Sequence, residues 1–471
     1  MRRGTARFLL AFAAGAVAGV ASGQASVAPV IVHEWGTFTS LQDESGRAIG
    51  GINTDDEPVP GFVHRLSSSL LQSPTEVPPI FFQGAPACHP DVTMRLETPV
   101  LYFHLPPGRN ALHRVNVTAQ FRGGWLTEFY PAALADAPGV QDRARSFGPL
   151  RADTVGTLAW RNLDVGDVGL GPQTNEHVWT SPRDVTSASV RTDGGEIEKF
   201  LFYRGVAHID APLAVSHGGA ARLALRAQLP AELATSGVFE VRSLWLVDIA
   251  PTGGIAFRVL PTLTLDAAGG RPATISAEFA PGDYSENNRA KLEDSLQQAL
   301  VVEGLFDDEA RALLNTWELS YFKSPGLRLF FLVPRTWTDH YLPLAVSTPA
   351  QIVRAMVGRI ELVTPRQRDT LARIGELSTA QIDAEAQRLH DSFYDRLGNR
   401  SPDDVDRGAE SLAAYGTFVP KSYQLYLELG RFRNALLLDE ARWRPRPALD
   451  AFIAAYGLEG YAPVSFTAEA R

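Results

Sequence analysis

Short apolar stretches separated by glycine and proline occupy the chain from residue 29 to residue 279. They are rich in β-branched and aromatic residues, and several alternate apolar with polar positions, which is typical of β-strands. Glycine pairs stand between many of them, where turns are needed. The stretches expected to form strands are 30–39, 99–104, 114–121, 199–203, 220–227, 238–249 and 255–265. This pattern predicts antiparallel sheets packed like a sandwich.

A helical period replaces the strand pattern near residue 284. Apolar stripes predict two helices, and three short apolar runs after them predict strands, at 327–333, 342–346 and 353–362. Two capping boxes, Thr364 to Gln367 and Ser378 to Gln381, then mark helix starts. Further helices are expected at 402–414, 421–441 and 447–456.

The predicted fold class is therefore α+β. We expect a signal peptide over residues 1–25 and a β-rich domain over 26–282. A mixed α/β segment is expected over 283–363, followed by a helical region over 364–471.

The first 25 residues have the three parts of a secretory leader. Arginines stand at positions 2, 3 and 7, residues 8–21 are apolar, and small residues follow up to Ala25. This pattern predicts Sec export to a bacterial periplasm or envelope and cleavage after Ala25. Retention of the leader as an anchor is the alternative.

The composition narrows the classes of partner. The net charge is −9 and no run is rich in lysine or arginine, which argues against nucleic acid. After the leader no apolar run is long enough to span a bilayer, so we expect no transmembrane segment. Cys88 is the single cysteine, which rules out an intrachain disulfide. An envelope ligand or protein partner is expected, and no motif specifies a cofactor.

The segment His33-Glu34-Trp35 places polar side chains inside an apolar strand. Strand alternation predicts Glu34 on one face and the other two on the opposite face. The functional interpretation makes Glu34 a ligand-orienting group or a general acid/base. It makes His33 a metal ligand, a proton carrier or a ligand-binding group, and Trp35 a ligand contact. The structural alternative pairs Glu34 with an arginine, such as Arg204, and His33 with a backbone carbonyl.

Glu97 and Glu128 are two more acids in apolar or aromatic strands. If they converge with Glu34, they form paired carboxylates suited to glycosidic or other acid/base chemistry. Arg204, at the end of an apolar strand, is a candidate clamp for a ligand carboxylate or a partner to a buried glutamate.

His208 and Asp210 share one face of an expected strand. With His33 they form a candidate zinc or copper site. The polar and aromatic segment 334–341 lies between two expected strands and is predicted to be a loop at a pocket.

Several phrases resemble an uncharacterised family of exported bacterial proteins. The most specific is the octapeptide His-Glu-Trp-Gly-Thr-Phe-Thr-Ser at residues 33–40, just after the leader. The others lie at 97–103, 127–131, 199–205 and 357–362. The resemblance implies export and one full-length unit, and it implies no activity.

Two functions follow from these observations. The first is an exported binding or scaffold protein with an aromatic and acidic pocket. The second is a hydrolase of envelope or extracellular polymer, acting through paired carboxylates or a histidine-based metal site.

Overall fold

The computed structural model describes residues 28–54, 58–66, 81–141, 146–219, 221–397 and 419–465. The predicted leader and the predicted helix at 402–414 lie outside these ranges. Within them, no helix combines the length and apolarity needed to cross a membrane.

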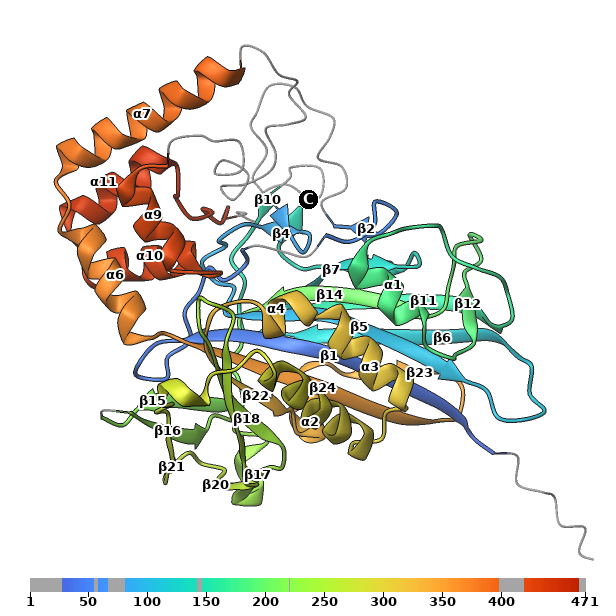
Figure 1. Ribbon diagram of the computed structural model, residues 1–471. Helices are drawn as coiled ribbons and strands as arrows, with labels where there is room; N and C mark the ends of the chain where they lie inside the picture. The colour runs from blue at the N-terminus through green and yellow to red at the C-terminus, as the bar shows by residue number, and fades with distance from the viewer. Residues whose placement is uncertain are drawn as a thin grey trace, which may run out of the picture.

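The α+β prediction is confirmed: strands dominate the first half of the chain, and helices dominate its C-terminal region. A mixed sheet of 15 strands organises the molecule around β1 (Val30–Gln42) (Figure 1). β1 pairs antiparallel with β5 (Met94–His104) and parallel with β24 (Ala350–Leu362). The sheet thus joins strands on both sides of the predicted boundary at residue 282. A sandwich arrangement of the N-terminal half stays a prediction.

The other strands of this sheet lie on both sides of that central trio. They are β2 (His64–Arg65), β6 (Ala111–Arg122), β7 (Gly124–Tyr130), β8 (Leu134–Asp136), β11 (Val155–Gly166), β12 (Ser189–Arg191), β13 (Ile197–Glu198), β14 (Leu201–Ala207), β18 (Leu244–Ile249), β19 (Ile255–Leu260), β22 (Gly326–Leu332) and β23 (Leu344–Val346).

Small sheets and turns complete the β structure. They comprise β3 (Phe81–Phe82) with β4 (Ala85–Pro86), β9 (Val140–Gln141) with β10 (Ser146–Phe147), β15 (Leu213–His217) with β16 (Arg222–Ala227) and β21 (Ala273–Ser276), β17 (Val238–Val241) with β20 (Leu263–Asp266), and the 3₁₀ turns η2 (Ala234–Ser236) and η3 (Pro281–Asp283).

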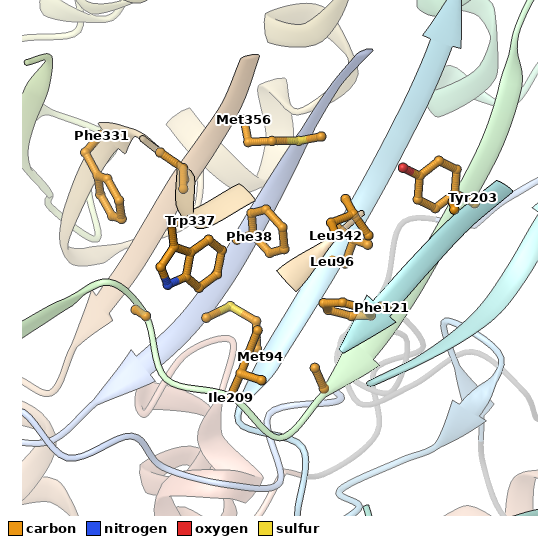
Figure 2. Packing of buried hydrophobic residues seen from close by; sticks show 14 of the residues in the cluster. Phe38, Met94, Leu96, Phe121, Tyr203, Ile209, Phe331, Trp337, Leu342 and Met356 are labelled. Atoms are coloured by element: carbon orange, nitrogen blue, oxygen red, sulfur yellow. The ribbon is translucent and has the colours of Figure 1, made fainter. Parts of the chain in front are cut away.

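One face of the central sheet packs around Phe38 of β1. Figure 2 shows this cluster. In it the Trp337 and Phe38 rings pack edge to face, with their centroids 5.0 Å apart. Phe331 lies over Gly358 of β24, where an added Cβ would come within 2.2 Å of the phenyl ring. Only glycine fits there, because the strand and the ring approach so closely.

Trp337 belongs to α5 (Arg335–Tyr341), so the prediction of a loop at 334–341 is wrong: the segment forms a helix. Its Arg335–Asp339 ion pair at i,i+4 favours the helical turn.

The opposite face packs around Trp35 and is covered by helices (Figure 1). These are α1 (His177–Arg183), α2 (Asn288–Val302), α3 (Asp307–Thr316) and α4 (Glu318–Phe322). Because both faces of β1 are covered, twelve of its thirteen residues are buried, and these include polar residues such as His33 and Glu34.

The C-terminal helices gather at one end of the sheet (Figure 1). They are α6 (Pro365–Gly375), α7 (Thr379–Leu397), α9 (Lys421–Glu428), α10 (Arg433–Trp443) and α11 (Pro447–Tyr456). The capping box at Thr364 and Gln367 is confirmed. The single helix expected at 421–441 is two helices, because Gly430 takes a left-handed conformation (φ 83°) that ends the first.

Candidate functional site

A cleft of about 1000 Å³ lies where the loop after β1, the segment after β14 and α5 come together. It is lined by Ser45, Gly46, Arg47, Ala48, Thr93, Arg122, Ala152, His208, Ile209, Asp210, Ala214, Gln228, Pro230, Glu232, His340 and Tyr341. The pocket expected at 334–341 is therefore present at its last two residues. His208 and Asp210 lie in the same cleft.

Charges of both signs face this cleft. Arg122, Asp210 and Glu232 are exposed, and within the described ranges their side chains make no hydrogen bond or ion pair. Burial, and then the positive charge of Arg122, lower the pKa of His340. Burial, and then the charges of Asp210 and Glu232, raise the pKa of Tyr341 to about 12, which keeps its hydroxyl protonated. The cleft thus offers hydrogen-bond donors and acceptors that have no partner in the described part of the chain.

His208 forms a hydrogen bond with the backbone. Its Nδ1 lies 2.7 Å from the carbonyl oxygen of Asp91, and its ring is exposed in the cleft. His33 is 1% exposed and has other partners, so the structure does not assemble His33, His208 and Asp210 into one site.

Glu34 is fully buried and already paired. It bonds the guanidinium of Arg354, its register partner on β24, and accepts a hydrogen bond from the Tyr203 hydroxyl. Arg354 also donates to Asp339 at 2.9 Å and to the Leu342 carbonyl at 2.7 Å. The expectation of an arginine partner holds, but the partner is not Arg204.

Glu97 belongs to a second buried network. It lies 3.3 Å from Arg95 Nε and 3.0 Å from Arg431 Nη2, and it accepts a hydrogen bond from Thr39 at 2.9 Å. Burial alone would raise the pKa of Glu97. The charges of Arg431 and Arg95 outweigh burial and lower this pKa to about 2. Glu97 therefore stays ionised at neutral pH, where a general acid would need a proton.

Glu128 and Arg204 are each other's partners. Arg204 Nε bonds one oxygen of Glu128, and Arg65 Nε donates to the other at 2.8 Å. Glu34, Glu97 and Glu128 thus sit in three separate ion-pair networks and do not converge. Arg204, 2% exposed, serves as a structural partner to a carboxylate, and Trp35, 0% exposed, packs in the core.

His33 instead meets His104 and Glu309. His33 Nδ1 is 2.6 Å from Glu309 Oε2, and His104 Nε2 is 2.9 Å from Glu309 Oε1. One ligand atom from each residue lies within 4.8 Å of the others, so within the described ranges this trio is the group able to hold a metal ion. Burial raises the pKa of Glu309, but hydrogen bonds from His104 and His33 outweigh it and lower this pKa.

The sequence pattern did not point to Glu309, Arg354 or Arg95. Glu309 follows two acids at a helix start, where carboxylates are ordinary caps. The sequence could have indicated Arg354. Alternation within 350–362 places Arg354 on the same face as the apolar Met356 and Ile360, which predicts that it is buried. A buried arginine requires a buried acid nearby.

Comparisons with known proteins do not assign this chain to a family. No family model matches the chain, and no curated protein matches it. Among solved structures, it is similar to the Fcho1 Mu homology domain of Danio rerio with bound Eps15 peptide. The match is 10% identical, covers 71% of this chain and 95% of that one, and has a TM-score of 0.25. So low a score carries no argument about fold or function.

Proposed function

We propose that this chain is an exported ligand-binding protein whose cleft holds a charged saccharide fragment of the bacterial envelope. One observation carries the proposal: Arg122, Asp210 and Glu232 face the same cleft, and no described residue pairs with their side chains. Charges that the protein does not neutralise are available to a ligand at no cost in broken ion pairs.

The lining matches the chemistry of such a ligand. Asp210, Glu232 and Gln228 accept hydrogen bonds from hydroxyl or amino groups, and Arg122 binds a carboxylate or phosphate. The Tyr341 ring supplies an apolar face, and its protonated hydroxyl is a donor. A few directional polar groups around a ring are typical of small-molecule sites.

Binding is favoured over hydrolysis because the three strand carboxylates are occupied. Glu34, Glu97 and Glu128 are each buried and bonded to arginine, so none of the three presents a carboxylate to a substrate. The paired-carboxylate mechanism expected from these three residues is therefore not supported by their positions.

Calorimetric titration with soluble peptidoglycan fragments, neutral oligosaccharides and peptides tests the proposal. The double variant Arg122→Gln/Asp210→Asn should weaken binding of a charged saccharide by roughly tenfold or more, since each lost charged hydrogen bond is worth about 1.5–3 kcal/mol. Arg161→Gln/Asp136→Asn removes two exposed charges outside the cleft and is the matched control. Equal affinity of both variants, or binding of peptides alone, rejects the proposed ligand class.

Export has its own test. Cell fractionation followed by N-terminal sequencing should recover a periplasmic protein that begins at Ser26. A cytoplasmic protein that begins at Met1 would reject export and leave the cleft without an envelope ligand.

A further inference from the structure

His33, His104 and Glu309 come from three different elements, and local structure aims each one. In the antiparallel pairing of β1 and β5, His33 faces Tyr102 and His104 faces Ile31. The two histidines are therefore diagonal neighbours on one face of the sheet. Their ring centroids are 5.0 Å apart.

Glu309 reaches this pair from the first turn of α3. Its Oε2 accepts the backbone N–H of Phe306 at 2.8 Å, the carboxylate half of a capping box. This bond orients the carboxylate toward the sheet. The Phe306 ring lies 4.6 Å from the His33 ring and 4.7 Å from the His104 ring, so it covers the trio.

Glu309 differs from the other buried carboxylates of the described chain in its counter-charge. Glu34, Asp43, Glu97, Glu128, Glu198, Glu361, Asp439 and Glu440 each have an arginine within ion-pair distance. Glu309 is 0% exposed, and within the described ranges its ion-pair partners are two histidines, with no arginine or lysine. A buried carboxylate without a permanent cation is costly.

Two imidazole nitrogens and a carboxylate oxygen are the donor set of three-ligand zinc sites, whose fourth position is left to water. We propose that His33 Nδ1, His104 Nε2 and Glu309 together bind one Zn²⁺ ion. The cation supplies the charge that arginine supplies elsewhere, and the Phe306 amide holds the ligating carboxylate in place. The His104 side chain, 12% exposed, provides the route from solvent. The site shares no residue with the cleft and does not depend on its function.

Zinc loading of the full-length protein tests this site. The protein is purified without affinity metal, incubated with Zn²⁺, passed over a chelating resin and analysed for metal. We expect about one zinc per chain. Co²⁺ in place of zinc should give the visible bands of a four-coordinate ion.

Two variants and one control make the result specific. Glu309→Gln keeps the capping box, which accepts glutamine at this position, but removes the anion. His104→Asn removes a ligand at a partly exposed position. Each should lower zinc affinity by roughly tenfold or more, with an unchanged circular dichroism spectrum. His64→Asn is the control, because His64 pairs with Glu196 at 2.8 Å and no second histidine of the described residues pairs with that carboxylate.

Three outcomes would overturn the proposal. A wild-type protein that stays metal-free after loading shows the trio to be a hydrogen-bonded link between α3 and the sheet. Zinc retained equally by Glu309→Gln and His104→Asn places the ion elsewhere. Zinc lost from His64→Asn places it near β2.

Discussion

The buried networks around Glu34 and Glu97 and the open cleft beside α5 both concentrate charge, but they use it differently. In the networks each carboxylate is fully buried and bonded to arginine. In the cleft, Arg122, Asp210 and Glu232 are exposed and lack partners within the described chain. The acids in apolar strands are the candidates that the sequence suggests, yet these acids are already bonded to arginine and are not available to a ligand.

The difference follows from the cost of desolvation. A charge removed from water must be paired, whereas an exposed charge is solvated until a ligand displaces the water. The networks should therefore control stability, and the cleft should control binding.

Arg354→Met should produce the largest loss of stability. It leaves Glu34 buried without its cation, which typically costs about 3–5 kcal/mol. Urea unfolding followed by circular dichroism measures the change. The control is Arg335→Met, which breaks a pair with Asp339 whose side chains are 44% and 47% exposed. It should cost under about 1 kcal/mol. Similar losses in the two variants would contradict the contrast between buried and exposed charge.

Acid should weaken the network around Glu97. Its pKa is about 2 in the folded protein against an ordinary 4.5, a difference equivalent to about 3 kcal/mol. Because the folded-state pKa is the lower one, this stabilisation is complete above pH 4.5 and is lost as the pH falls toward 2.

Urea midpoints at pH 5 and pH 3 measure this effect. The wild type should lose more stability between them than Glu97→Gln, which has no proton to gain at this site. Glu240→Gln, at a 44% exposed side chain, is the control and should follow the wild type. A wild type and a Glu97→Gln variant with the same pH dependence would show that Glu97 is not held ionised.

Tyr203→Phe sharpens the comparison within one network. It removes the hydroxyl that donates to the buried Glu34, a bond to a charged group worth about 2 kcal/mol. Tyr284→Phe removes a similar bond, at 2.6 Å, to the part-exposed Asp248 and should cost about 1 kcal/mol. Thermal unfolding of both variants compares the two losses of stability. A larger loss for Tyr284→Phe than for Tyr203→Phe would show that the Tyr203 hydroxyl is not important for the network around Glu34.

Arg122→Gln/Asp210→Asn should have the smallest effect on stability. Both side chains are exposed and unpaired within the described ranges, so the free energy of unfolding should change by less than about 0.5 kcal/mol. The same variant should lose ligand affinity in the titration described above. A large loss of stability would instead make the cleft part of the structural framework.

The sequence by itself determined the elements with strong local patterns. Alternation along 30–39 separates Phe38 from Trp35, and the structure places them in two different core clusters. The Thr364–Gln367 capping box begins α6. These features depend on contacts between residues close in the chain, so a single sequence records them.

Only the tertiary structure decided how those elements pair. The parallel register of β1 and β24 sets Glu34 beside Arg354, 320 positions away, and α3 brings Glu309 to His33 across 276 positions. Both faces of β1 are buried, so its own side chains do not show which strands lie beside it or in which register. Which arginine neutralises which acid, and which charges are left for a ligand, therefore follows from packing between distant segments and leaves no periodic signal in the chain.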